Sequence, residues 1–138
     1  MVAWDVPYRA FLSMTPRRLH RSHDIRAVFA ARNVAHGRLL TVYAIRRARG
    51  SGETPQARAA VVAGRDVGGA VQRNRAKRRL RAALATGALP PGLDLVVRAH
   101  PAAIDADFVV LETELGDLIG RAAAKAARVT AKTGEVRG

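Results

Sequence analysis

Residues 73–81 read RNRAKRRLR, and this stretch decides how the rest of the chain is interpreted. Six of its nine residues carry a fixed positive charge. At 100° per residue, a helix over this stretch gathers four polar side chains at i, i+3, i+4 and i+7 on one face: Asn74, Lys77, Arg78 and Arg81. The apolar residues fall on a separate side: Ala76, Leu80, Ala83 and Leu84. The pattern predicts a helix that docks on a hydrophobic core and presents a cationic front.

The charges of this helix favour a polyanionic partner. Like charges four residues apart, such as Arg75 and Arg79, each destabilise an isolated helix by about 0.2–0.5 kcal/mol, and phosphate groups would reverse that sign. Arginine also grips phosphate with two parallel hydrogen bonds and stacks on bases, whereas lysine offers a point charge. A solvated helix face is the alternative interpretation, but such faces normally include Glu, and residues 73–81 contain no acid.

The composition bounds the possible functions. With 138 residues, of which 49% are hydrophobic, the chain is long enough for one core, and we expect one domain. A formal net charge of +13 makes a polyanion the first candidate partner and an acidic membrane surface a distant second. No apolar run approaches the roughly 20 residues that span a bilayer, and no signal peptide is evident, so we expect a cytoplasmic protein. The absence of cysteine excludes disulfides and thiolate chemistry.

Periodicity divides the chain before the basic stretch into an extension, a helix and two strands. Residues 1–14 match no periodic template and are expected to form a disordered N-terminal extension. A helix capped by Ser22 follows and should end before His36. Residues 39–46 alternate as a strand with both faces partly covered, and residues 58–63 form a second strand.

The basic helix is followed by a third strand at residues 93–98 and by a last helix that Asp105 or Asp107 can cap. Five of the eleven acids lie in this last helix and its cap region, which indicates that negative charge is kept apart from the basic helix. We therefore expect a single RNA-binding domain over residues 15–126 and a disordered basic tail over residues 127–138.

The sequence offers no recognisable catalytic or metal-binding group. The four histidines are scattered along the chain, and none has a carboxylate at metal-ligand spacing. Glu112 and Glu114 stand two residues apart in a helix and point in different directions, so a paired-carboxylate site is not expected. We predict no catalytic residue and no metal site, and expect the reactive groups of any RNA cleavage to come from elsewhere.

The sequence resembles the protein component of bacterial ribonuclease P over roughly residues 18–123. The stretch 73–81 fits the family pattern R-N-x-x-K-R-x-x-R in register. Supporting matches are the helix with Val28 and Phe29, the strand with Tyr43, VGGAVQ at 67–72 and LDLVVRAHP at 93–101. The order and spacing of these elements agree together, which is more specific than any one motif.

The resemblance implies an α/β (α+β two-layer) domain of the kind found in the second domain of ribosomal protein S5. Its four-stranded sheet would contain a left-handed parallel crossover and would be packed by about three helices. The partner would be a large catalytic RNA that carries the active site and binds Mg²⁺, while the protein alone would bind no cofactor. No membrane and no obligate protein partner are expected. The RNA-binding residues would be Arg73, Asn74, Arg75, Lys77, Arg78, Arg81 and Arg65.

The resemblance also implies a cleft for the 5′ leader of precursor tRNA, between the first helix and one face of the sheet. This cleft would carry over to Ile25, Phe29, Thr41 and Tyr43. Aromatic rings stack single-stranded bases without demanding a sequence, which suits a leader that differs between tRNAs. An ordinary core position is an equally good interpretation of Phe29.

The chain departs from the family pattern near the sheet. Residues 62–66 replace the usual Ser-x-Ser-Lys-Lys and keep one cation, Arg65, while Gly69 replaces an Asn and Ile25 a Phe. Two other function classes stay open beside the resemblance. One is a binding module such as a ribosomal protein or RNA chaperone; the other is a helix-turn-helix DNA binder, which the flanking strands do not fit.

Overall fold

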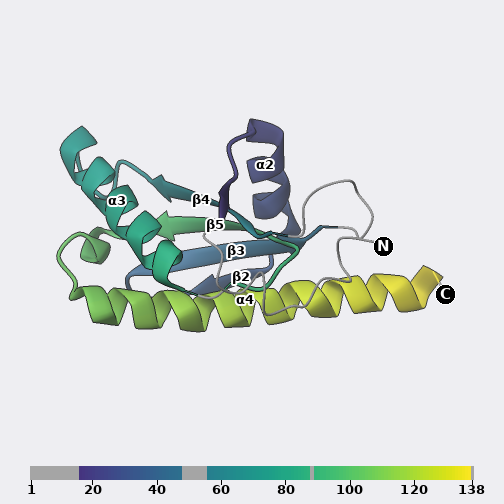
Figure 1. Cartoon of the computed structure of the whole chain (residues 1–138). Coiled ribbons are helices and arrows are strands. Elements are labelled where there is room, and N and C mark those ends of the chain that lie inside the picture. Colours follow the sequence, from purple (N-terminus) through teal and green to yellow (C-terminus); the bar gives the residue numbers. More distant parts are fainter. Residues whose placement is uncertain (1–15, 48–55, 88, 138) are drawn as a thin grey trace.

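The computed structural model describes residues 16–47, 56–87 and 89–137 (Figure 1). The expected N-terminal extension, residues 1–14, lies outside these ranges. Within them the chain forms three α-helices: α2 (Ser22–Ala31), α3 (Ala70–Thr86) and α4 (Phe108–Arg137). The strands are β1 (Arg17–Arg18), β2 (Val34–His36), β3 (Leu40–Arg46), β4 (Arg58–Ala63) and β5 (Leu93–Ala99), with a short 3-10 helix at Pro101–Ala103.

The strands form one mixed sheet in the order β1-β4-β5-β3-β2. Strands β1, β4 and β5 are parallel, whereas β5, β3 and β2 pair antiparallel. The parallel neighbours β4 and β5 are joined through α3, as expected for a parallel crossover, and the hand of this crossover stays a prediction. The expected number of four strands is wrong, because the described residues form five, including a two-residue β1 beside β4.

Helix α2 starts and stops close to its predicted bounds. Ser22, the predicted cap, is the first helical residue, and Arg21 holds the N-cap position without a side-chain hydrogen bond. The helix ends at Ala31 because Arg32 takes a left-handed conformation, with φ 56°. The chain then enters β2, an edge strand that periodicity did not predict. Asn33 fixes this entry, since its side-chain Nδ2 donates to a β3 carbonyl at 3.1 Å.

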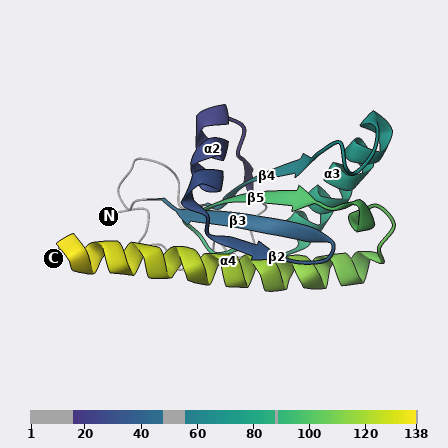
Figure 2. The same ribbon diagram turned by 180° about the vertical axis from the view of Figure 1, so that it is seen from behind.

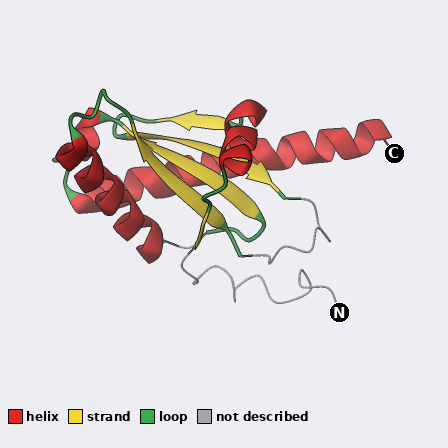
Figure 3. Cartoon of the chain, turned by 90° about the horizontal axis from the view of Figure 1, so that it is seen from above, coloured by secondary structure: helices red, strands yellow, loops and turns green. Residues whose placement is uncertain are grey.

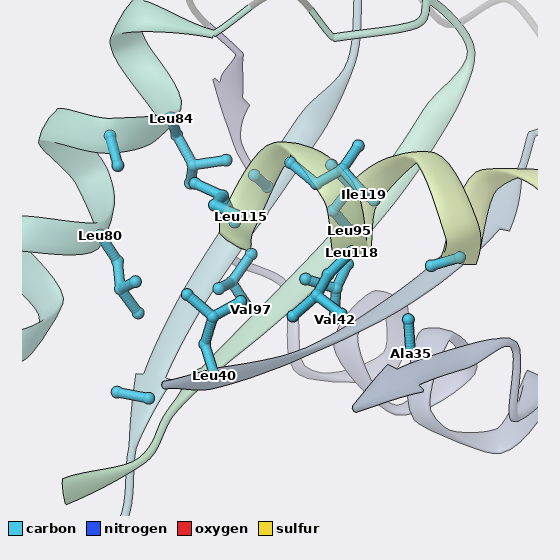
Figure 4. Packing of buried hydrophobic residues seen from close by; sticks show 14 of the residues in the cluster. Ala35, Leu40, Val42, Leu80, Leu84, Leu95, Val97, Leu115, Leu118 and Ile119 are labelled. Carbon is cyan, nitrogen blue, oxygen red and sulfur yellow. The ribbon is translucent and has the colours of Figure 1, made fainter. Parts of the chain in front are cut away.

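Helices cover both faces of the sheet, with α2 on one side and α4 along the other (Figures 1 and 2). The main hydrophobic core lies between the sheet, α3 and α4, and receives Leu40 and Val42 from β3 (Figure 4). On the opposite face, Val28 of α2 packs with Val96 and with the half-buried Tyr43. The expected two-layer arrangement is therefore wrong. Strand β3 carries apolar residues on both faces, so each face needs a cover.

The start of α4 is fixed by two carboxylates. Asp107 accepts a hydrogen bond from the N–H of Val109 at 2.9 Å, in agreement with its predicted capping role. Glu114 accepts three backbone N–H groups from residues 38–40, at 3.2, 2.7 and 3.1 Å, and ties the turn between β2 and β3 to the helix. Gly37 leaves room for this carboxylate, because a Cβ there would stand 2.8 Å from Glu114 Cδ.

Helix α4 continues to Arg137, through residues 127–137, which were expected to form a disordered tail. The Ala-rich stretch at 122–127 favours helix, and each further residue adds one hydrogen bond to a helix already begun. Lys125 Nζ donates to the carbonyl of Val34 at 2.5 Å and holds α4 against β2. Beyond this contact the helix extends past the sheet (Figure 1).

Candidate RNA-binding surface

The basic helix α3 has the two sides that its sequence predicts. Its four predicted apolar residues are buried against the core: Ala76, Leu80, Ala83 and Leu84. Figure 4 shows Leu80 and Leu84 reaching from α3 into this core. On the other side Asn74, Arg75, Arg78 and Arg81 are exposed, and Lys77 is half-buried. We call Asn74, Lys77, Arg78 and Arg81 the cationic front.

The cationic front has little counter-charge among the residues that the structure describes. The helix Ala70–Thr86 carries six cations and no acid. Of its predicted RNA-binding residues, only Arg75 forms an ion pair within the described ranges, with Asp105 at 3.7 Å, and both side chains are largely exposed. Such a pair contributes little to stability. Arg73 is half-buried, and its Nε has no hydrogen-bond partner among the residues that the structure describes.

Arg79 belongs to the same basic stretch but serves the scaffold. Its guanidinium lies against the loop that leads into α4 and donates to the carbonyl oxygens of Ala103, Ile104 and Ala106. The Nη1 to Ala103 distance is 3.0 Å. These acceptors lie 24 to 27 residues away in sequence, so the sequence alone could not distinguish Arg79 from its neighbours.

A second surface lies on the sheet face that α2 covers only in part (Figure 3). Phe29 of α2 and Tyr43 of β3 meet edge-to-face, with ring centroids 4.7 Å apart and an interplanar angle of 70°. Both rings are half-buried, and Ile25 packs against the same small cluster. The structure thus brings together three of the four residues predicted for the cleft. We call Ile25, Phe29 and Tyr43 the α2-side surface.

Thr41, the fourth predicted cleft residue, stands two residues before Tyr43 in β3 and is buried. It is 2% exposed, and its hydroxyl stands 2.7 Å from Nε2 of His100. His100 follows β5 and is 59 residues away in sequence, so the pairing could not be predicted from local pattern. Its burial and its contact with His100 indicate that Thr41 supports the strand, and a contact of Thr41 with the leader stays a prediction.

Two cations border the α2-side surface at the far end of the sheet. Arg98 pairs in the sheet with Thr41 and Val62, and its side chain is 47% exposed, 3.8 Å from Asp66. Arg65, predicted to bind RNA, is exposed in the turn after β4. Arg98 was not among the predicted site residues. The signal in the sequence was a single cation directly after the three apolar residues 95–97.

A buried ion cluster holds the sheet together beneath α2. Asp94 is 2% exposed and accepts from Arg47 at 2.5 Å and from Arg58 at 2.6 and 2.8 Å. Arg58 also lies 4.0 Å from Asp24 of α2. Paired in this way, the buried charges avoid the penalty that an isolated buried carboxylate would carry. The cluster therefore links α2 to β4, β5 and the residue that follows β3, and sequence reasoning missed it because its members are far apart in the chain.

No group of three His, Cys, Asp or Glu residues within the described ranges is placed to hold a metal ion. His23 lies 3.1 Å from Asp24, without a third ligand. Over the same ranges, no helix combines the length and apolar character needed to cross a membrane.

Comparison with known proteins identifies the family. The model of the Ribonuclease P family matches residues 14–123, which contain both surfaces. The chain belongs to the bacterial ribonuclease P protein family. It is 42% identical over 106 residues to the ribonuclease P protein component of Acidothermus cellulolyticus, covering 75% of this chain and 86% of the relative. It is 41% identical over 114 residues to that of Streptomyces bikiniensis, covering 78% and 92%. The chain is thus a protein component of ribonuclease P.

Solved ribonuclease P proteins share the fold. The protein from Thermotoga maritima matches with a TM-score of 0.64 and 24% identity, covering 76% of this chain and 96% of that one. The protein from Staphylococcus aureus matches with a TM-score of 0.61 and 20% identity, covering 75% and 92%. At these identities the likeness concerns the fold alone, and it supports the mixed α+β architecture.

Proposed function

We propose that this ribonuclease P protein binds the catalytic RNA through the cationic front of α3 and the 5′ leader of precursor tRNA through the α2-side surface. The observation that carries the first assignment is the acid-free helix Ala70–Thr86, whose exposed cations lack counter-charges among the described residues, apart from Arg75 with Asp105. RNA phosphates would supply that charge, and release of their counterions would drive binding. Arg65 and Arg73 would extend the contact beside the front.

The RNA would carry the active site. Acids near the two surfaces already have cationic neighbours, Asp105 beside Arg75 and Asp66 beside Arg98. No three-ligand group is placed for a metal ion in the described ranges, which supports a site on the RNA in preference to one on the protein. Mg²⁺ for phosphodiester hydrolysis would therefore be bound by the RNA. The protein would reduce repulsion between the two RNAs and hold the substrate.

The α2-side surface suits a single strand of variable sequence. Half-buried rings offer π faces on which any base can stack, and such stacking contributes about 1–3 kcal/mol per base. The rings of Phe29 and Tyr43 are held by each other and by the cluster around Val28. Arg98 and Arg65 would then contact leader phosphates at the far end of the surface.

Reconstitution with the cognate RNA tests the two contacts separately. Arg78→Ala and Arg81→Ala should each weaken holoenzyme assembly and reduce the log-log salt slope by about 0.7–0.9. Tyr43→Ala should weaken precursor tRNA binding by about 1–3 kcal/mol and leave binding of mature tRNA, which lacks the leader, unchanged. Equal weakening toward both tRNAs would instead indicate lost folding or a contact with the shared tRNA body.

Single-turnover cleavage tests the assignment of catalysis to the RNA. At saturating RNA and protein variant, high Mg²⁺ should partly rescue the arginine variants, because the RNA retains the chemistry. A loss of several orders of magnitude that Mg²⁺ cannot restore would mean that a side chain acts directly in the reaction, and RNA catalysis would have to be abandoned.

Four finer points stay predictions. They are the left-handed β4–α3–β5 crossover, the kinship with the second domain of ribosomal protein S5, the cytoplasmic location and the absence of an obligate protein partner.

A further inference from the structure

A cavity of about 380 Å³ opens at the edge of β4, between α2 and α3. Its lining is mainly apolar and includes Ile25 of α2 and Leu84 of α3. Three polar side chains stand at its exposed rim: Arg18, His20 and Arg81. A volume of this size lies in the range of pockets that hold small ligands. The cavity thus combines apolar walls with cationic groups from two separate elements.

One residue of β4 that lines this cavity, Val61, has backbone groups on the outer edge of the sheet without a hydrogen-bond partner among the described residues. Strand β1 pairs with β4 only at Arg58 and Ala59, and the last bond on this edge runs from the N–H of Leu19 to the carbonyl of Ala59. Backbone groups alternate sides along a strand, so the N–H and C=O of Val61 face the same edge as those of Ala59. Among the described residues, neither group of Val61 has a hydrogen-bond partner on this edge.

We infer that this cavity binds one unpaired RNA nucleotide, an inference that rests on the proposed function. The free N–H and C=O of Val61 offer one donor and one acceptor to the hydrogen-bonding edge of a base. The apolar side chains of Ile25 and Leu84 cover the base, and Arg18 and Arg81 bind the adjoining phosphates. The base would therefore satisfy backbone groups that have no partner among the described residues, without displacing any bond of the sheet.

Two sources can supply this nucleotide, because the cavity joins both surfaces of the protein. Ile25 belongs to the α2-side surface and Arg81 to the cationic front. The 5′ leader and an unpaired segment of the catalytic RNA share the required chemistry. A peptide strand added to the same edge would use the backbone groups equally well, but it would not use the cationic rim.

Site-specific crosslinking in the reconstituted holoenzyme identifies the occupant. The chain has no cysteine, so His20→Cys introduces a single attachment point for a photoreactive group at the cavity rim. Arg78→Cys places the same group on the cationic front, and Asp117→Cys places it on the exposed acidic part of α4 as a control. We expect position 20 to crosslink to one or a few unpaired nucleotides, in the leader or in the catalytic RNA, and position 117 to give no such product.

A backbone variant tests the role of the free edge. Val61→Pro removes an N–H that faces away from the β5 ladder, so no sheet hydrogen bond is lost, as is usual for proline on an edge strand. Binding of the RNA that supplies the nucleotide should weaken about 2- to 10-fold, the effect of one hydrogen bond. A loss confined to precursor tRNA identifies the leader, and a loss in holoenzyme assembly identifies the catalytic RNA. Urea unfolding of the variant verifies that it is folded.

The outcomes separate this proposal from the proposed function. Crosslinks from position 78 with none from position 20 would overturn the nucleotide pocket and leave the α3 contact standing. Crosslinks from neither position would overturn both. Crosslinks from position 20 to base-paired RNA alone would also overturn the pocket, because a paired base cannot enter it. If Val61→Pro does not fold, the crosslinks from position 20 decide alone, since that variant keeps the natural backbone.

Discussion

Arg79 and Arg78 are adjacent in sequence, and the structure predicts opposite consequences for their replacement. Arg79 donates to three carbonyls of the loop before α4, whereas Arg78 is exposed on the cationic front. Arg79→Ala should therefore destabilise the fold and leave the RNA contact intact. Arg78→Ala should weaken RNA binding and leave stability nearly unchanged. The two variants remove the same side chain from the same helix, so each is the control for the other.

The loss of unfolding free energy in Arg79→Ala can be estimated from the three carbonyl oxygens that accept its hydrogen bonds. A hydrogen bond to a charged group contributes about 1.5–3 kcal/mol, which would give about 4.5–9 kcal/mol for three fully buried bonds. Arg79 is only half-buried, and water can replace part of the lost bonding, although Ala103 is 0% exposed. We expect a loss of about 2–4 kcal/mol for Arg79→Ala, against less than about 0.5 kcal/mol for Arg78→Ala.

Urea unfolding and RNA titration together measure the two effects. With an m value of about 2 kcal/mol/M, Arg79→Ala should lower the urea midpoint by about 1–2 M at unchanged m. Arg78→Ala should lower the log-log salt slope of RNA binding by about 0.7–0.9. An unchanged midpoint for Arg79→Ala would refute the scaffold role. A salt slope reduced equally in both variants would show that Arg79 also contacts phosphate.

Three further predictions concern single positions. Leu80→Ala removes a fully buried side chain and should cost about 2–5 kcal/mol in urea unfolding, while RNA affinity should fall only with the folded fraction. Glu114→Gln should cost about 1–3 kcal/mol in urea unfolding, because an amide cannot accept hydrogen bonds from all three N–H groups of residues 38–40. An unchanged urea midpoint would show that Glu114 does not anchor the turn between β2 and β3. Asp117→Lys should change affinity for the catalytic RNA by less than about threefold, because salt screens a charge that lies far from the cationic front. A larger change would indicate that α4 lies against the RNA.

The parts of the fold that depend on local periodicity could be predicted from sequence. The spacing of Ala76, Leu80, Ala83 and Leu84 identified the buried side of α3, because a helix fixes which residues share a face. The alternation of β3 predicted cover on both faces, and the structure has helices on both. That observation contradicts the two-layer architecture implied by the family resemblance.

Features that depend on distant partners could not be predicted. Strand β2 has three residues and is defined by its pairing with β3, after a turn in which Arg32 adopts a positive φ. Thr41 is buried because His100 returns beside it, and Asp94 is buried where two arginines reach it, Arg58 from β4 and Arg47 from the end of β3. Thr and Asp are residue types that usually lie exposed, and in this fold the tertiary partners of Thr41 and Asp94 bury them.

The charge of α3 can remain available for RNA because the helix is stabilised by other contacts. Burial of Leu80 and Leu84 contributes about 1.5–3 kcal/mol each, whereas a like-charge pair at i, i+4 costs about 0.2–0.5 kcal/mol. Arg79 adds further stabilisation by bonding to carbonyls of the loop before α4. The balance favours a helix that is formed before assembly, so phosphates meet a preorganised row of cations. The salt dependence of RNA binding would then report phosphate contacts and not the folding of α3.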